Sequence, residues 1–307
     1  VLALSGFGPI VRPTKAQPDL DLILDFNAAA TFPTFDPSIG SVIKPLIALE
    51  YLDGLRTGEY TVPFEEFLPC GGKQPYRPDE LNTSRRFGCE ERHGDATQSV
   101  AMAIQESCNI CFYETFWHSR KTEKGAVAPA MTNRIGWMWN DERNLIVGLD
   151  PRMLLTPREG KRQVDSNGDI VGRSRMVRTV GYDFRVSAID VARAYAMLAT
   201  GQNPGVGLIA ERERKSRDLD WHQDDLEFVR TGMKGSLFAG SGASVGKAMK
   251  GFLDEETVEA AYGKTGTACV GYQSQGEGLP RRDMYNSWFA SFLGTGPRAS
   301  LVVVAVA

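Results

Sequence analysis

The chain has 307 residues, with 35 Lys and Arg against 38 Asp and Glu, which leaves a formal charge of −3 at neutral pH. Hydrophobic residues make up 42% and charged residues 24%, so disorder, collagen and coiled coil are excluded as descriptions of the whole chain. The balanced charge and the lack of a long basic stripe argue against nucleic acid as a partner. The alternating charges of residues 211–215 predict a solvated helix face.

Helical periodicity appears first in two segments. Apolar residues recur with helical spacing along 41–56, and Pro45 falls in the first turn, where its missing N–H costs little. Residues 96–117 are predicted to be helical for at least their first half, with Thr97 as the N-cap. Between the two segments, residues 57–95 are rich in Gly, Pro and charge, which predicts a long loop with a short hairpin.

The second half of the chain changes from helix to strand. Residues 118–180 are polar and turn-rich. A helix is predicted over 187–200, capped by Ser187 and followed by Gly201. The tail, 256–307, has strand-like runs separated by turn residues, which predicts antiparallel neighbours.

These segments predict an α+β fold in which a helical lobe interrupts a sheet lobe. The sheet lobe is expected from about 1–40 and 256–307, and the helical lobe from about 41–255. The chain does not begin with Met and stops inside an apolar run, so we expect one domain, 1–307, that is incomplete at both ends. No stretch approaches the roughly 18 apolar residues of a membrane span, so any membrane anchor is expected outside this sequence.

Five residues are cysteines: Cys70, Cys89, Cys108, Cys111 and Cys269. An odd number leaves at least one thiol without an internal partner. Cys70 and Cys89 both lie in a predicted loop and either form a disulfide or stay free. Cys108 and Cys111 have CxxC spacing, but no second pair follows them.

The histidines give no metal-binding pattern. His93, His118 and His222 are far apart in the sequence and form no HExxH motif and no His-Cys cluster. His93 is therefore expected to brace a loop. The sequence predicts neither a metal site nor a cofactor.

Three short motifs occur in order along the chain. They are an SxxK at 41–44, an SxN at 107–109 and a KTGT at 264–267. The last motif follows Gly263, so a P-loop is the alternative to test. A P-loop would need Gly at position 258, where Val258 stands, so that alternative fails.

The first motif has the groups of an activated nucleophile. Residues i and i+3 share a helix face, so Lys44 can reach the hydroxyl of Ser41. An amine becomes a base near neutral pH when burial and a nearby cation lower its pKa, and Lys264 is the expected cation. Positive potential at the helix N-terminus favours an oxyanion at Ser41.

The second motif adds a proton relay. The hydroxyl of Ser107 can pass a proton between Lys44 or Lys264 and a leaving group. The side chain of Asn109 offers a donor and an acceptor to a peptide backbone.

The third motif suits a carboxylate. Thr265 and Thr267 present hydroxyls beside Lys264, and Gly266 lets a substrate strand lie close. The backbone N–H groups of Ser41 and Thr267 are the expected oxyanion hole.

The motifs and their flanks resemble the D,D-transpeptidase domain of penicillin-binding proteins, in the SxxK, SxN and KTG serine acyltransferase superfamily, with class B character. The similar stretches are 34–49, 85–114, 180–201, 262–268, 286–295 and 300–306. Cys108 is an unusual middle residue for the SxN motif.

The resemblance implies a mainly antiparallel sheet flanked by helices, with an all-helical lobe against one edge. It implies that Ser41 is the nucleophile and Lys44 the base. It implies five further residues that line the cleft or bind the substrate carboxylate: Ser107, Asn109, Lys264, Thr265 and Thr267. It implies no cofactor, and a chain that lacks the first strand and the closing helix.

The implied function is cross-linking of peptidoglycan stem peptides through a serine acyl-enzyme, with β-lactams as covalent inhibitors and other cell-wall synthesis proteins as partners. The implied location is the outer face of the bacterial cytoplasmic membrane. Alternatives are a β-lactam sensor domain, a D,D-carboxypeptidase and a serine β-lactamase. A class A β-lactamase needs an acidic residue between the second and third motifs, and neither Glu142 nor Glu159 has the expected context.

Overall fold

The computed structural model of the chain describes residues 38–74, 76, 87–94, 99–120, 127–140, 145–147, 176–182, 184–186, 188–204, 216–273 and 282–306. Several sequence-based expectations lie outside the described residues: the strands before residue 38, the Thr97 and Ser187 caps, the charged run 211–215, Glu142 and Glu159.

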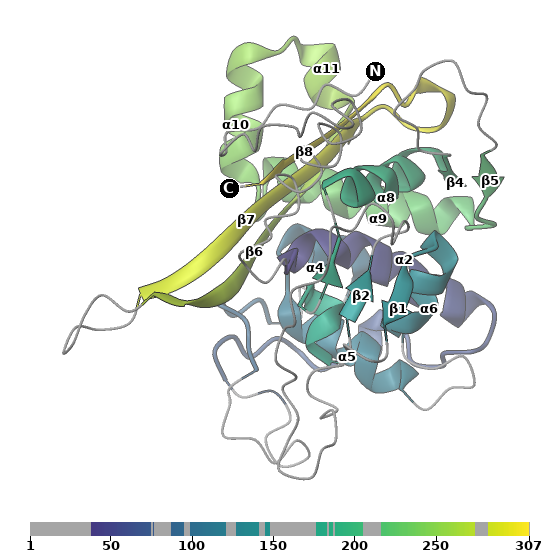
Figure 1. Cartoon of the computed structure of the whole chain (residues 1–307), viewed down its shortest axis with the longest axis vertical. Coiled ribbons are helices and arrows are strands. Elements are labelled where there is room, and N and C mark those ends of the chain that lie inside the picture. The colour runs from purple at the N-terminus through teal and green to yellow at the C-terminus, as the bar shows by residue number, and fades with distance from the viewer. Residues whose placement is uncertain are drawn as a thin grey trace, which may run out of the picture.

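The main sheet is formed by the end of the chain. Strands β6 (Ala261–Gln273), β7 (Arg282–Leu293) and β8 (Leu301–Val306) are antiparallel neighbours in that order (Figure 1). In the register, Lys264 lies opposite Ala290. The prediction of antiparallel closing strands is confirmed.

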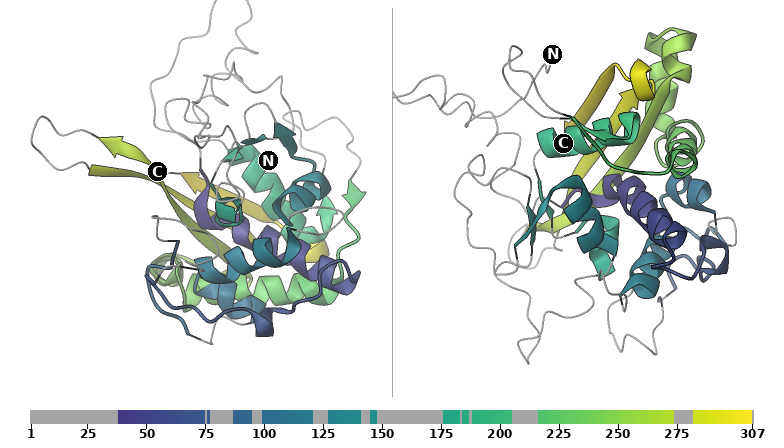
Figure 2. Two further views of the ribbon diagram at one scale, coloured as in Figure 1. Left: turned by 90° about the horizontal axis from the view of Figure 1, so that it is seen from below. Right: turned by 90° about the vertical axis from the view of Figure 1, so that its right-hand side faces the viewer.

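Helices cover both faces of this sheet. Helix α8 (Ala188–Thr200) packs on β7 and β8, and α9 (Gln223–Phe238) packs on β6. The right panel of Figure 2 shows α8 on one side of the sheet and α9, α10 (Ala243–Phe252) and α11 (Glu255–Glu259) on the other. Gly201 follows α8 with φ +76°, as expected of a C-terminal glycine.

The helical part is built around α2. A short 3-10 turn, η1 (Gly40–Ile43), leads directly into α2 (Lys44–Arg56). Helices α4 (Val100–Gln105), α5 (Asn109–Ser119) and α6 (Val127–Ile135) pack against α2. Three further 3-10 turns among the described residues are η2 (Phe64–Glu66), η4 (Arg178–Val180) and η5 (Gly296–Arg298). One small sheet consists of β1 (Met138–Asn140), β2 (Leu145–Val147) and β3 (Phe184–Arg185). A second small sheet consists of β4 (Gln202–Asn203) and β5 (Arg217–Asp218).

Helix α2 is buried almost all round. Leu46, Ile47, Ala48, Leu49 and Tyr51 are each at most 1% exposed. Such burial explains why apolar residues cover more than one stripe of the helix. Lys44, the last residue of the SxxK motif, begins this buried helix and is therefore held in the interior of the protein.

Two local expectations need correction. The helix expected for at least the first half of 96–117 is present as α4, and α5 follows it after a break; the cap of α4, however, is Ser99, whose hydroxyl accepts a hydrogen bond from the amide of Met102. The segment 118–180, expected to be turn-rich, contains α6 as well as β1 and β2. The proposed division into two lobes stays a prediction.

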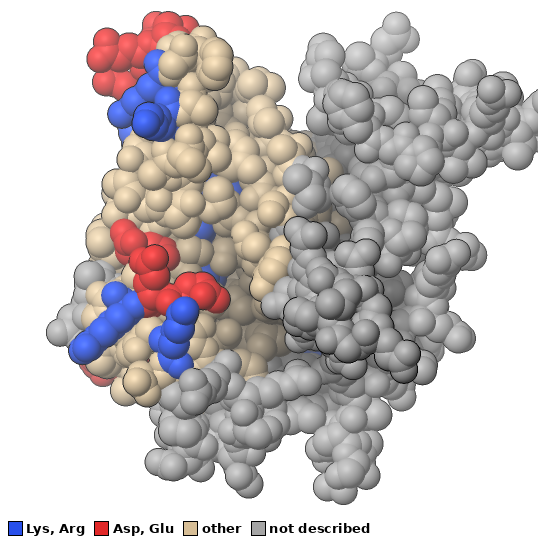
Figure 3. Space-filling view, turned by 90° about the vertical axis from the view of Figure 1, so that its left-hand side faces the viewer, with Lys and Arg blue, Asp and Glu red and all other residues tan. Residues whose placement is uncertain are grey.

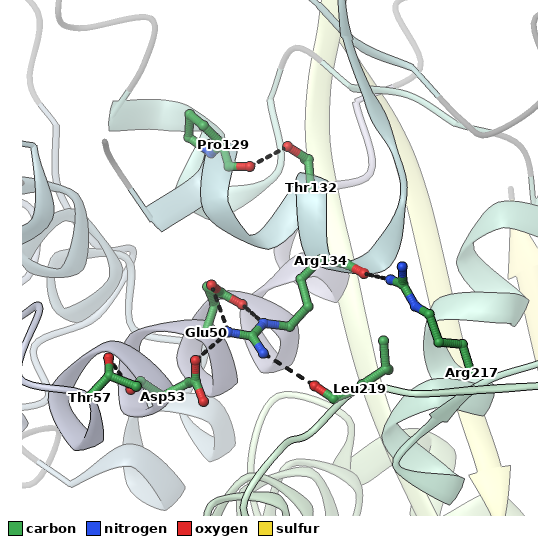
Figure 4. Close-up of polar contacts among 8 residues, drawn as sticks. All are labelled: Glu50, Asp53, Thr57, Pro129, Thr132, Arg134, Arg217 and Leu219. Carbon is green, nitrogen blue, oxygen red and sulfur yellow. Dashed lines mark hydrogen bonds and ion pairs between the residues drawn. The ribbon is translucent and has the colours of Figure 1, made fainter. Parts of the chain in front are cut away.

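Arg134 on α6 ties the helical part together (Figure 4). Its guanidinium donates to Glu50 at 2.7 Å and to Asp53, both on α2, and to the carbonyl of Leu219 at 3.2 Å. Arg217 donates to the main-chain carbonyl of Arg134. Because Glu50 is only 6% exposed, the positive charge of Arg134 compensates a carboxylate that is shielded from water.

One face of the molecule carries mixed charge. On the face in Figure 3, acidic and basic side chains lie side by side in small groups, with uncharged surface between them. Among the described residues, no helix combines the length and the apolar character needed to cross a bilayer.

Candidate active site

Ser41 lies in η1, and two glycines let the surrounding backbone approach it. A Cβ on Gly266 of β6 would lie 3.1 Å from the amide nitrogen of Ser41 and 3.0 Å from that of Val42. A Cβ on Gly40 would lie 2.9 Å from the amide nitrogen of Thr267. We had expected Gly266 to make room for substrate, but here it makes room for the turn that carries Ser41.

A third glycine supports the same turn from the other side. The carbonyl of Gly181 accepts hydrogen bonds from the amides of Ile39 and Gly40, at 3.0 and 3.2 Å. Gly181 has φ +96°, and a Cβ there would overlap the carbonyl of Gly40. The hydroxyl of Tyr195 on α8 donates to the carbonyl of Val42 at 2.9 Å. Ser41 is thus on a turn fixed from several elements.

Lys44 is fully buried, with 0% of its surface exposed. Its Nζ donates to the carbonyl of Ser107 at 2.5 Å, to the hydroxyl of Ser107 at 3.2 Å and to Oδ1 of Asn109 at 2.7 Å. The ring of Phe112 lies below the ammonium, 5.4 Å from Nζ to the centroid. Burial lowers the pKa of Lys44 to about 8.

Ser107 occupies a backbone position that usually belongs to glycine. The amide of Ser107 donates to the carbonyl of Ile104, and that of Cys108 donates to the carbonyl of Ala103. These two bonds form a Schellman motif at the end of α4, with Ser107 in the left-handed C′ position at φ +55°. Because a serine is strained in this conformation, its presence here indicates that the hydroxyl has a function.

Asn109 begins α5 and uses both ends of its amide inside the protein. Oδ1 accepts from Lys44, and Nδ2 donates to the carbonyl of Gly88 at 3.2 Å. One N–H of Nδ2 is left over, so the expected contact of Asn109 with a substrate backbone stays a prediction. In this arrangement Asn109 positions Lys44.

Lys264 on β6 is 1% exposed, and its Nζ donates to the hydroxyl of Ser241 at 2.8 Å. The hydroxyl of Thr265 also donates to that of Ser241, at 3.2 Å. Burial and, second, the charge of Lys44 lower the pKa of Lys264 well below its usual value. Burial is the largest cause of the lowered pKa at both lysines, and the expected influence of one lysine on the other acts on Lys264.

The structure joins the second motif to Lys44 by hydrogen bonds and packs the third motif against the turn of Ser41. No hydrogen bond connects Ser41 to Lys44 among the described residues, which is common before substrate binds. Thr265 is partly exposed and Thr267 is exposed, so both hydroxyls face solvent while the two lysines are enclosed.

The sequence analysis missed Ser241 and Gly181. Ser241 lies in a Gly-rich turn between α9 and α10, and only the packing of that turn beside β6 reveals it. The expectation of no His-Cys cluster is also wrong. Cys70, Cys89, His93 and Cys108 place their ligand atoms within 4.8 Å of one another, next to the SxN motif.

Comparisons with known proteins agree with this architecture. The chain resembles the apo transpeptidase domain of penicillin-binding protein 3 from Burkholderia pseudomallei, with a TM-score of 0.53 and 20% identity over 89% of this chain and 70% of that one. It also resembles penicillin-binding protein PBP2 from Helicobacter pylori, with a TM-score of 0.54 and 16% identity over 89% of this chain and 45% of that one. No curated protein matches the sequence.

The family model of the penicillin-binding protein transpeptidase domain matches residues 151–307, just over half of the chain. The match includes the KTGT motif at 264–267, while the first two motifs precede it. Together with the α+β architecture, it shows that the chain belongs to the family of penicillin-binding protein transpeptidase domains, with a penicillin-binding function of the serine acyltransferase type.

Proposed function

We propose that the chain is a D,D-transpeptidase that cross-links peptidoglycan stem peptides through an acyl-enzyme on Ser41. The observation that carries the proposal is Lys44: a buried amine with a pKa near 8, three residues after Ser41 and bonded to the hydroxyl of Ser107. Penicillin-binding transpeptidase domains act on peptidoglycan at the outer side of the membrane, and we place the cross-linking there.

Acylation begins at the peptide bond between the two terminal D-alanines. Ser41 Oγ attacks the carbonyl carbon as its proton passes to neutral Lys44. The oxyanion faces the amides of Ser41 and Thr267. Ser107 delivers a proton to the leaving nitrogen as the C–N bond breaks, which releases D-alanine and leaves an ester on Ser41.

The second half returns the enzyme to its starting state. The amine of a neighbouring stem peptide attacks the ester carbonyl and loses a proton, and the bond to Ser41 Oγ breaks as that oxygen regains a proton. Lys264, Thr265 and Thr267 hold the substrate carboxylate, because the two hydroxyls are accessible beside the buried amine of Lys264, which can donate hydrogen bonds to it. A β-lactam enters by the same attack, but its amine stays tethered after the ring opens.

The test is the reaction of the purified chain with a fluorescent penicillin, followed by intact mass. We expect a stable adduct on Ser41 that is absent in Ser41→Ala. Ser300→Ala is the matched control, because Ser300 is exposed in the turn before β8. A folded protein without an adduct would contradict the nucleophile assignment, and rapid release of opened drug would indicate a β-lactamase.

A second measurement separates transfer from hydrolysis. The wild type is given a stem pentapeptide with and without an added amine acceptor. A transpeptidase forms the ligated peptide when the acceptor is present. Release of D-alanine with water as the only acceptor, whatever amine is added, would identify a D,D-carboxypeptidase, and acylation without any turnover would fit a sensor.

A further inference from the structure

Three cysteines and one histidine meet directly behind the SxN motif. Cys70 follows η2, Cys89 and His93 lie in the next described loop segment, and Cys108 lies between α4 and α5. The one ligand atom that each offers lies within 4.8 Å of the other three. The three cysteines are buried and unpaired.

The spacing of two sulfurs fits a tetrahedral metal ion. Sγ of Cys89 lies 3.7 Å from Sγ of Cys108. Two thiolates bound to zinc at about 2.3 Å with tetrahedral angles lie about 3.8 Å apart. A disulfide would bring them to about 2.05 Å. The observed distance excludes a disulfide and fits two ligands that share an ion, as well as a hydrogen bond between two thiols.

The histidine supplies a second, independent observation. Nδ1 of His93 is buried and has no hydrogen-bond partner among the described residues. Buried polar atoms are normally satisfied, so an unpartnered one calls for an explanation. Coordination of an ion by the imidazole is such an explanation, since a neutral ring offers one lone pair.

The backbone holds the loops that carry these groups in place. Cys70 and Gly94 exchange hydrogen bonds of 3.3 and 3.2 Å between their backbone groups, and the amide of Cys89 donates to the carbonyl of Gly72 at 2.9 Å. Among the residues described between α2 and α4, the only regular element is the short 3-10 turn η2. Small, loop-rich segments of this kind commonly depend on a metal or a disulfide.

We propose that Cys70, Cys89, His93 and Cys108 bind a zinc ion. Three sulfurs and one imidazole form a donor set that suits zinc, and hard oxygen-seeking cations such as magnesium or calcium disfavour it. Four protein ligands leave no open position for water, so the ion has a structural role.

The site is joined to the serine chemistry through Asn109. The amide of Asn109 donates to Sγ of Cys89 at 2.8 Å, and its side chain holds Lys44. Cys108 is itself the middle residue of the SxN motif. An ion bound to the sulfurs of Cys89 and Cys108 would fix the turn that sets the positions of Ser107 and Asn109. This role would explain why the middle residue of the SxN motif is a cysteine.

The experiment measures metal content in the full chain, purified without chelators from zinc-supplemented medium. We expect about one zinc per chain in the wild type. Cys89→Ala and Cys108→Ala should lose it. Cys111→Ala is the matched control, because Cys111 is equally buried on α5 but outside the group of four, and it should keep the metal.

Cobalt loading of the wild type keeps the proposal testable if a cysteine variant does not fold. We expect the visible spectrum of tetrahedral cobalt with thiolate charge-transfer bands, the same in Cys111→Ala and altered in His93→Ala. A folded wild type that binds neither zinc nor cobalt would overturn the proposal, as would an intact mass showing a Cys70–Cys89 disulfide. Ser41→Ala should keep the metal, so the result is independent of the proposed transpeptidase activity.

Discussion

The amide of Gly40, the residue directly before Ser41, donates a hydrogen bond of 3.2 Å to the carbonyl of Gly181. The two glycines touch because neither has a Cβ, and a side chain at Gly181 would overlap the carbonyl of Gly40. The loop after η4 therefore helps to hold the turn of Ser41, although it lies far from that turn in sequence.

Gly181→Ala should slow β-lactam acylation at least tenfold, because the new methyl group displaces the turn of Ser41. The control is Gly58→Ala, where φ is +76° but nothing lies within 4 Å of the added Cβ. That variant should lose about 1 kcal/mol of stability and keep its acylation rate. Equal rates in the two variants would show that Gly181 does not position the turn.

Ser107→Gly should separate stability from function. Glycine relieves the left-handed strain at φ +55°, so the free energy of unfolding should rise by about 1 kcal/mol. Acylation should fall because the hydroxyl bonded to Lys44 is gone. Ser107→Ala keeps the strain and loses the hydroxyl, so it should be slow without being stabilised. Denaturant titration and acylation kinetics measure the two effects, and full activity in either variant would argue against a role for this hydroxyl.

The pH profile of acylation should follow the neutral form of Lys44. With a pKa of about 8, only about a tenth of the molecules carry the free amine at pH 7. The rate should therefore increase through pH 8, where half of the molecules carry the free amine, and level off above about pH 9.

Asn109→Asp puts a carboxylate on the ammonium and should move this profile upward by about one pH unit or more. Asn133→Asp, at an exposed position on α6, should leave the profile unchanged. A profile that does not respond to Asn109→Asp would exclude Lys44 as the titrating base.

Arg134→Met should destabilise the fold by about 3 kcal/mol, because it removes the guanidinium that pairs with the buried carboxylate of Glu50. Arg217→Ala removes one exposed contact to the carbonyl of Arg134 and should cost less than about 1 kcal/mol. Thermal and denaturant unfolding give both values. A similar loss in the two variants would mean that the ion pairs between α6 and α2 contribute little.

Removal of the proposed zinc should slow acylation by roughly tenfold, as for other groups that position a site without touching substrate. The reason is that Asn109, which donates to Cys89, would lose its fixed position beside Lys44. Acylation rates before chelation, after it and after zinc is restored provide the measurement. A rate that is unaffected by chelation of metal-loaded protein would separate the metal site from the serine chemistry.

The sequence by itself determined the chemical groups of the site and the elements with strong local periodicity. A short stretch of residues predicts each of three features: the helix after Ser41, the helix ending before Gly201 and the antiparallel closing strands. Their patterns are local, because 3.6-residue and 2-residue periods decide which side chains share a face.

Only the tertiary structure decided the environment of these groups. The break at Ser107, the burial that lowers the pKa of Lys44, the support from Gly181 and the group around Cys108 all depend on segments that are distant in sequence. Contacts of this kind follow from how the helices and loops pack, and a linear spacing such as that from Cys70 to Cys108 does not encode them. The candidate reactive groups could therefore be named from the sequence, whereas their distances and their protonation were set by packing.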